Sequence, residues 1–285
     1  MKRRLATWMQ RARSLVTLPL SKQRVTSLAA LPLSMRRLTL LRTLPRSMHR
    51  ATLFAAFPLA LLISACAATD QRGDTSGPVA TAPTPTVGAR WVYRGREGFR
   101  SPLVWEETHE VTRAGPDGVS VRVTLKGPSV DVERYEAFTG PGLLQTGALM
   151  DIETRRFKTP LERYRFPLAP GQTWNQWVDN YNQSTDRTGQ INRYVRVGKW
   201  EKVTTPAGVF DAIRMRVLMR LDDEEFWRYP TTCNYVIWYA PAVGASVREE
   251  KDAEYIERGD EMDGSGTIRA QHTLLELVSY TPGRG

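Results

Sequence analysis

The 285-residue chain has a formal net charge of +10 at pH 7, and the excess lies at its N-terminal end. Residues 1–65 contain twelve Lys or Arg and no Asp or Glu, which leaves 28 basic and 30 acidic residues in 66–285. The C-terminal 220 residues are therefore slightly acidic, long enough for a buried core, and without the basic patch that would make nucleic acid an expected partner.

An export signal precedes Cys66. Met48-His49-Arg50 supplies positive charge, residues 51–63 form a mostly apolar run, and Ser64-Ala65 place small residues before the cysteine. The run is too short to cross a bilayer core of about 30 Å as a helix, whereas its layout is that of a secretory signal. Leu62-Ile63-Ser64-Ala65-Cys66 closely resembles the lipobox of bacterial lipoprotein precursors.

The lipobox resemblance implies that the chain is cut before Cys66 and that acyl chains, palmitate among them, are attached there. Each buried methylene contributes about 0.8 kcal/mol, so two or three chains give a stable membrane anchor. In the lipoproteins that this chain resembles, Asp after the cysteine favours the inner membrane. Ala67 therefore predicts a lipid-anchored protein on the periplasmic face of the outer membrane.

The chain divides into three expected regions. Residues 1–65 are a signal peptide behind an overextended N-terminus, with Met1, Met35 and Met48 left open as the true start. Residues 66–87 are rich in Ala, Thr, Gly and Pro, which predicts a flexible tether after the lipidated cysteine. Residues 88–285 carry the folded periplasmic domain.

This domain is predicted to be mainly β. Apolar residues alternate with polar ones over 119–125, and the turn signal Gly115-Pro116-Asp117-Gly118 joins this strand to 103–113 as a hairpin. A second alternating run places the apolar face Ile213, Met215, Val217, Met219 and Leu221 opposite Arg214, Arg216 and Arg220.

Further strands are expected along the rest of the domain. Residues 235–240 are apolar on both faces, which suits a central strand. A final pair spans 245–257 and 267–280, and no long helical periodicity competes. Many short strands need a covered or closed edge, so the fold class expected is a curved antiparallel sheet or half-open β-barrel.

Several motifs together resemble a known group of proteins. Pro167-Leu168-x-x-Gly171-x-x-Trp174 is followed by Val203-x-x-Pro206-Ala207-Gly208-x-Phe210-x-Ala212 and then by Trp238-Tyr239-Ala240-Pro241-x-Val243-Gly244. This order resembles the uncharacterised, periplasmic TapB-like lipoproteins of Gram-negative bacteria, and it implies a β-rich periplasmic domain. A more distant analogy is to the LolA/LolB carriers, whose half-open barrel holds acyl chains. Neither resemblance brings catalytic residues, and Pro206-Ala207-Gly208 is expected to form a tight turn.

No catalytic constellation is evident in the sequence. Cys233 is expected to be a buried thiol, and His109 and His272 have no metal-ligand spacing. A nucleophile elbow and a phosphate loop are both missing, and the acidic runs 222–225 and 249–250 are typical of solvated surfaces. We therefore expect no catalytic residue, no metal, no cofactor and no enzymatic activity.

Aromatic and methionine side chains are the remaining candidates for a binding site. A concave face lined by them would suit an acyl chain or a sugar ring. The candidate ligand-facing residues are Trp174, Trp177, Met215, Met219 and Trp238. The function expected is a membrane-anchored lipoprotein that binds an amphipathic ligand or a protein partner in envelope maintenance. The alternatives are a scaffold subunit of an envelope assembly and a cell-wall glycan binder or hydrolase.

Overall fold

The structure, a computed structural model, describes residues 77–98, 103–150, 152–259 and 266–284, and these residues form twelve strands and no helix. Consequently, no described segment has the helical length and hydropathy that a membrane crossing requires. The strands are β1 (Arg90–Glu97), β2 (Leu103–Gly115), β3 (Gly118–Gly127), β4 (Val130–Gly140), β5 (Leu143–Gly147), β6 (Arg155–Glu162), β7 (Thr173–Asn182), β8 (Arg187–Thr205), β9 (Gly208–Asp222), β10 (Thr231–Ala240), β11 (Ala245–Ile256) and β12 (Thr267–Thr281).

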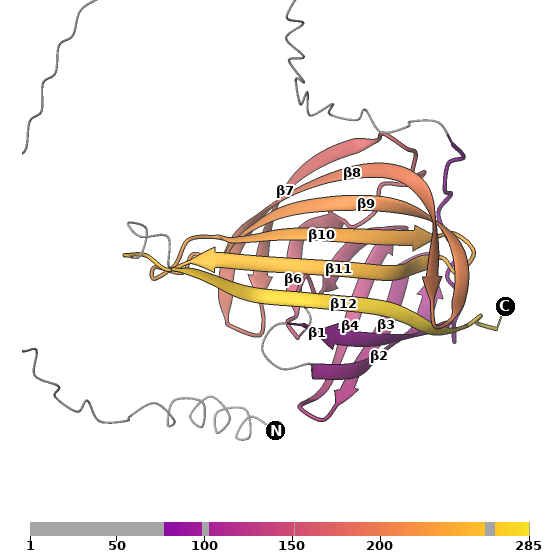
Figure 1. Cartoon of the computed structure of the whole chain (residues 1–285), viewed down its shortest axis with the longest axis horizontal. Helices are drawn as coiled ribbons and strands as arrows, with labels where there is room; N and C mark the ends of the chain where they lie inside the picture. The colour runs from indigo at the N-terminus through magenta and orange to yellow at the C-terminus, as the bar shows by residue number, and fades with distance from the viewer. Residues whose placement is uncertain (1–76, 99–102, 151, 260–265, 285) are drawn as a thin grey trace, which may run out of the picture. The chain divides into compact units, whose positions relative to one another are not determined.

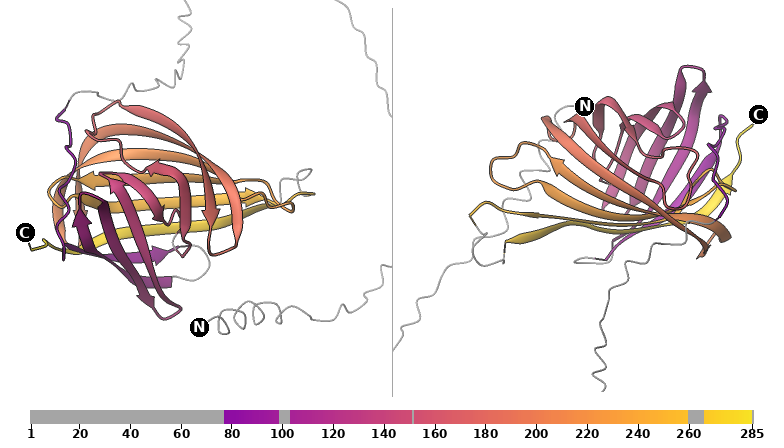
Figure 2. Two further views of the ribbon diagram at one scale, coloured as in Figure 1. Left: turned by 180° about the vertical axis from the view of Figure 1, so that it is seen from behind. Right: turned by 90° about the horizontal axis from the view of Figure 1, so that it is seen from above.

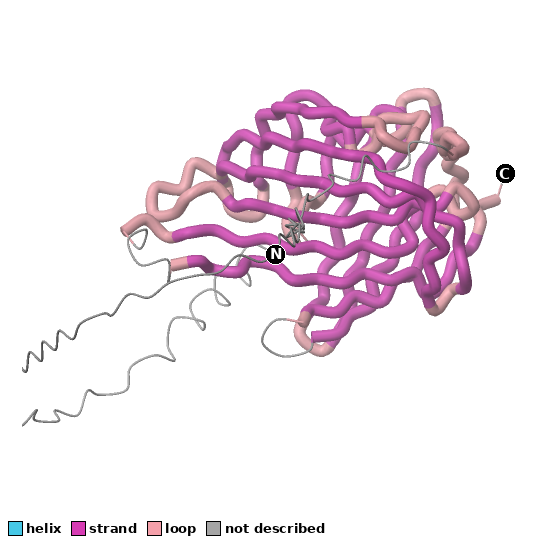
Figure 3. Tube along the Cα trace, turned by 45° about the horizontal axis from the view of Figure 1, so that its top comes forward, coloured by secondary structure: helices cyan, strands magenta, loops and turns pink. Residues whose placement is uncertain are grey.

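The strands form one closed antiparallel barrel (Figures 1 and 3). Each strand pairs with its neighbour in sequence, and β1 pairs with both β2 and β12, which closes the sheet. The mainly β, strongly curved fold is confirmed, and closure gives every strand a neighbour on both sides. Figure 2 shows the indigo and magenta strands facing the orange and yellow strands across the interior.

Two turns predicted from the sequence are present in the structure, one between β2 and β3 and one between β8 and β9. Gly115 pairs with Gly118, so Pro116-Asp117 is the two-residue turn between β2 and β3. Thr205 pairs with Gly208 around Pro206-Ala207, and Gly208 has a φ of 134°, which favours glycine. The alternation that defined these strands therefore also fixed their register.

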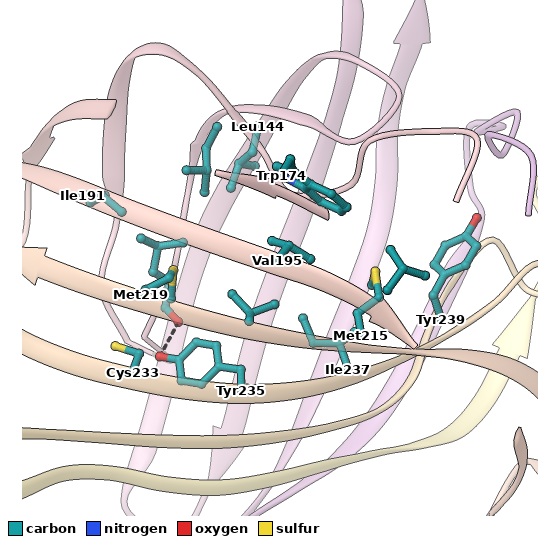
Figure 4. Close-up of a cluster of buried hydrophobic side chains, with 14 of the residues drawn as sticks. Leu144, Trp174, Ile191, Val195, Met215, Met219, Cys233, Tyr235, Ile237 and Tyr239 are labelled. Atoms are coloured by element: carbon teal, nitrogen blue, oxygen red, sulfur yellow. Dashed lines mark hydrogen bonds between the residues drawn. The ribbon is translucent and has the colours of Figure 1, made fainter. Parts of the chain in front are cut away.

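The predicted apolar face of β9 points into the barrel. Met215 and Met219 are buried beside Val195 of β8 and Tyr235 of β10 (Figure 4). Val217 is buried with them, whereas Arg216 and Arg220 on the opposite face are exposed. Residues directly paired across strands share a face, so Val195, Val217 and Tyr235 extend one interior row. Cys233 lies in the same core as a buried free thiol, as expected.

Side chains complete the barrel between β6 and β7. Their backbones pair only from Arg155 to Phe157. Beyond that point the Gln176 side chain donates to the Pro160 carbonyl at 2.9 Å and accepts from the Glu162 amide at 2.8 Å. One amide side chain thus takes the place of a pair of ladder hydrogen bonds.

The acidic run 222–225 is not entirely solvated, which corrects the expectation from sequence. Arg155 is fully buried and donates to both carboxylate oxygens of Asp223, at 2.6 and 3.0 Å. It also donates to Glu153 at 2.8 Å and to Asn180 at 2.8 Å. A buried guanidinium needs such partners, and they draw Asp223 inward.

Part of the predicted tether, 66–87, is packed on the barrel; residues 1–76, with the expected signal peptide and the lipidated Cys66, lie outside the described residues. Ala80 is buried and exchanges two backbone hydrogen bonds of 2.8 Å with Leu168. Trp200 donates its indole hydrogen to the Pro78 carbonyl at 2.9 Å. The low hydrophobicity of this segment did not prevent packing, because the small side chain of Ala80 fits into the core beside Leu168. The segment 77–87 therefore belongs to the folded domain.

Candidate functional site: a cavity inside the barrel

A cavity of about 530 Å³ lies inside the barrel. Its walls are inward-facing side chains of β1 to β4, β10, β11 and β12. The β2–β3, β4–β5 and β10–β11 turns also line it, which places its mouth at that end of the barrel. The volume falls within the range of about 300–1,000 Å³ that is typical of small-molecule sites.

One part of the cavity wall is apolar and aromatic. Val111 and Val121, which pair across β2 and β3, line it together with Phe138. Tyr239 packs against Tyr164 and Phe166, with ring centroids 5.2 and 5.4 Å apart. Aromatic rings in these tilted arrangements provide a rigid apolar surface for a ligand.

Pro83 and Pro85, from the segment before β1, complete the wall. Pro83 also lies against Gly244 in the β10–β11 turn, where a Cβ would come within 3.0 Å of the proline. Gly244 has a φ of 65°, so both the turn and the contact favour glycine. The chain that follows the expected lipidation site therefore forms part of the candidate site.

The opposite part of the wall carries buried charges. On β2, His109 Nε2 lies 2.7 Å from Glu107 Oε1, and Arg134 of β4 donates to the same oxygen at 3.3 Å. Burial disfavours the charged carboxylate, but the hydrogen bond with His109 and the positive charge of Arg134 lower the pKa of Glu107 far below its usual value. Glu107 is therefore ionised at neutral pH.

A second ion pair joins β4 to the chain after β6. Arg163 donates to Glu136 Oε2 at 2.9 Å and to the Ala148 carbonyl at 3.2 Å. Burial opposes ionisation of Glu136, but the charges of Arg163 and Arg134 lower its pKa below the usual value. Tyr164 of the aromatic wall directly follows Arg163 in the chain. The Arg163–Glu136 ion pair therefore also holds the aromatic wall next to the polar wall.

The third group lies on β11. Lys251 Nζ is 3.0 Å from Glu249, and Ser246 donates to the other oxygen of Glu249 at 2.6 Å. Tyr93 of β1 donates to the Ser246 carbonyl at 3.0 Å. Burial and the charge of Glu249 raise the pKa of Tyr164 to about 12, so its hydroxyl stays protonated.

Two buried oxygen atoms on side chains of the cavity wall have no hydrogen-bond partner among the described residues. They are the Tyr239 hydroxyl and Glu136 Oε1. Both side chains are about 1% exposed. In Figure 4 the Tyr239 hydroxyl points away from the other labelled side chains. Buried polar atoms normally have partners, and here Glu136 Oε1 has the Arg134 guanidinium 3.8 Å away, beyond hydrogen-bond distance.

The five candidate ligand-facing residues lie outside this cavity. Trp174, Met215 and Met219 point inward but are packed in the core. Trp177 is 60% exposed on the outer surface of β7. Trp238 also faces outward, between the guanidinium groups of Arg214 and Arg248, and donates to Glu201.

Sequence reasoning missed the charged wall because polar residues in an alternating strand are normally assigned to solvent. Glu249 of the acidic run 249–250 lies inside the barrel, which corrects the expectation of a solvated surface. The sequence of β2 could have predicted inward-facing charge, because Glu107 and His109 lie on the same face of the strand as Trp105 and Val111. His272 lies on the outer face beside Asp252, so the two histidines do not meet.

The described residues contain no group of three or more His, Cys, Asp or Glu that could hold a metal ion. The polar wall instead offers hydrogen-bond donors and acceptors: the cations of Arg134, Arg163 and Lys251 alternate with three carboxylates. Chemically, this arrangement can orient a polar group while the apolar wall holds a hydrocarbon part.

No family model matches the sequence, and no match is found among curated proteins. Two solved structures are similar to this chain. The first, from Bacteroides fragilis, is inferred to be exported and has a YmcC-like fold; the TM-score is 0.44 at 14% identity, over 71% of this chain and 99% of that one. The second, an inferred lipoprotein from Parabacteroides distasonis, has a TM-score of 0.41 at 16% identity, over 72% of this chain and 100% of that one. Both are similarities of fold, and the resemblance to TapB-like lipoproteins stays a prediction.

Proposed function

We propose that this chain is an exported lipoprotein, anchored through Cys66, whose barrel binds an uncharged amphipathic ligand without catalysing a reaction. The export signal and lipobox support the anchor, on the periplasmic face of the outer membrane. The cavity supports the ligand, because an apolar wall and a polar wall face the same space of about 530 Å³. The observation that carries the proposal is this cavity, whose lining includes two buried oxygens, the Tyr239 hydroxyl and Glu136 Oε1, without a hydrogen-bond partner among the described residues.

The polar wall favours an uncharged headgroup. Glu107, Glu136 and Glu249 are matched by Arg134, Arg163 and Lys251, so a charged ligand would enter without a counterion. Burying an unpaired charge costs several kcal/mol by order of magnitude. A hydroxyl or amide, in contrast, donates to Glu136 and accepts from Tyr239 at little cost. Monoacylglycerols and fatty amides have this chemistry.

The protonation of the wall supports binding over catalysis. A general acid or base works best with a pKa near the working pH. The pKa values of Glu107, Glu136 and Glu249 are instead lowered by their cationic neighbours, despite burial. These carboxylates hold fixed charges and are poorly suited to exchange protons with a substrate.

The proposal is tested by titrating the mature chain, carrying Cys66→Ala and prepared without detergent, with fluorescent 1-N-phenylnaphthylamine and with monopalmitoylglycerol. Val121→Phe fills the cavity and should abolish binding of both. Val209→Phe is the matched control, since Val209 is 63% exposed on β9, and it should bind normally. Equal binding by both variants, or tighter binding of the palmitate anion than of monopalmitoylglycerol, would contradict the proposal.

A separate measurement tests the anchor. Mass spectrometry of the cell-purified protein should find an N-terminal peptide that begins at acylated Cys66. An intact chain with an unmodified Cys66 would refute the anchor while leaving the cavity proposal open to the titration above.

A further inference from the structure

The outer surface of β7, β8 and β9 carries a group of side chains that the cavity does not use. Cross-strand pairing places them in adjacent rows: Trp177 aligns with Asn192 and then Arg220, and Tyr194 pairs with Leu218. Arg196 pairs directly with Arg216 in the next row. We call this surface the β7–β9 patch; it consists of Trp177, Tyr194, Arg196, Arg216, Leu218 and Arg220.

The charge of the β7–β9 patch is uncompensated. Arg196, Arg216 and Arg220 are exposed, and none of them pairs with a carboxylate within the described ranges. Residues directly opposite on neighbouring strands lie about 4.5–5.5 Å apart between Cβ atoms, where like charges destabilise the sheet. Placing Arg196 opposite Arg216 therefore works against folding, and a bound anion would relieve this repulsion.

Aromatic and amide groups surround these arginines. Trp177 is 60% exposed, Tyr194 is 39% exposed and Leu218 is 42% exposed, although such side chains are usually more buried. Asn192 donates to Asn175 at 2.9 Å, and Arg216 donates to Asn234 at 3.2 Å, so amides border the patch. Flat rings stack on the apolar faces of sugars, while amides bind hydroxyl groups.

From these features we infer that the β7–β9 patch binds an anionic polysaccharide whose carboxylate or phosphate groups pair with Arg196, Arg216 and Arg220. Arginine forms bidentate bonds with either group. An anionic bilayer fits less well, because the exposed Trp177, Tyr194 and Leu218 lie among arginine and asparagine side chains and form no continuous apolar face to insert. Arg216 and Arg220 are four residues apart on one strand, so their Cα atoms lie about 13–14 Å apart. That spacing suits an extended polymer that contacts several sites.

The experiment uses the full chain, purified from cells in an uncharged detergent, on sensors coated with polygalacturonate or with neutral dextran. The chain should bind polygalacturonate and not dextran, and 1 M salt should remove the binding because it screens exposed charges. Arg196→Gln combined with Arg216→Gln should weaken binding by about tenfold or more, since each charge-assisted hydrogen bond accounts for about tenfold. Trp177→Ala should weaken it further.

The matched control replaces Arg90 and Arg94, two exposed arginines of β1, by Gln, and it should leave the affinity unchanged. If both double variants weaken binding equally, the effect is one of net charge and the inference is wrong. Equal binding to dextran would overturn it as well. If the β7–β9 variant binds polygalacturonate normally but loses binding to phosphatidylglycerol vesicles, the partner is an anionic membrane and the glycan assignment is refuted.

Discussion

Replacing Tyr239 by Phe is expected to change stability and ligand affinity in opposite directions. In the ligand-free protein the hydroxyl is buried and has no partner among the described residues. An unsatisfied buried polar group costs about 1–3 kcal/mol, so its removal should raise the free energy of unfolding by about 1 kcal/mol. The phenyl ring keeps the contacts with Tyr164 and Phe166, whose centroids lie 5.2 and 5.4 Å away.

In the complex the same hydroxyl is proposed to donate a hydrogen bond to the ligand. Such a bond is worth about 0.5–1.5 kcal/mol, so Tyr239→Phe should weaken monopalmitoylglycerol binding by about two- to tenfold. The apolar aromatic amine 1-N-phenylnaphthylamine has no acceptor oxygen, and its affinity should not change. Comparing the two affinities therefore separates the effect of the lost hydrogen bond from any effect of the ring on the apolar wall.

Urea denaturation of the ligand-free chain and fluorescence titration give the two quantities. Tyr181→Phe is the control, because the Tyr181 hydroxyl donates to Asp186 at 2.7 Å on the exposed surface and should not affect either ligand. The reasoning is refuted if Tyr239→Phe destabilises the ligand-free chain. It is also refuted if the variant weakens both ligands to the same extent.

Three further predictions concern stability. Arg155→Met should cost about 3–5 kcal/mol in urea denaturation because it removes the buried guanidinium that pairs with Glu153 and Asp223 and leaves Asp223 with Arg228 alone. Lys202→Met, at an exposed ion pair, should cost less than about 1 kcal/mol. Burial raises the pKa of Cys233 to about 12, so labelling by a disulfide reagent at pH 8 should be about a thousandfold slower than for a thiol of pKa 9, until urea exposes the thiol. The pKa values of Glu136 and Glu249 are lower in the folded state, so their contribution to stability is present above about pH 4.3 and is lost as the pH falls through the folded values. Melting temperatures from pH 7 to 3 should fall most steeply below pH 4, and Glu136→Gln should flatten that fall.

The strands were predictable because their pattern is local. A buried face every second residue identifies β9 from Ile213 to Leu221, and turn residues mark both ends of the β2–β3 hairpin. Closure was not predictable, because it depends on the pairing of β1 with β12, which are far apart in the sequence. No local pattern distinguishes a closed barrel from the half-open one that was the alternative.

The candidate site was not predictable for a related reason. Alternation assigns residues to two faces without saying which face is inside, and apolar residues normally decide the matter. In β4, Arg134 and Glu136 lie on the inner face, where they pair with Glu107 of β2 and with Arg163, which follows β6. A single strand cannot reveal partners that only the closed barrel supplies, so these residues resemble surface positions in the sequence.

The segment before β1 links the proposed anchor to the cavity. Ala80 is fixed to the barrel by its pairing with Leu168, and Pro83 and Pro85 form part of the cavity wall. Counting from Cys66, the chain to Ala80 has fourteen residue steps, which span at most about 50 Å when extended at 3.3–3.6 Å each. An acylated Cys66 would therefore hold the cavity within about that distance of the membrane surface, close enough for a ligand to pass from lipid to barrel by a short diffusion path. Because Pro83 and Pro85 line the cavity, insertions between Ala80 and Pro85 should weaken ligand binding in the fluorescence titration more than insertions of equal length before Gly77.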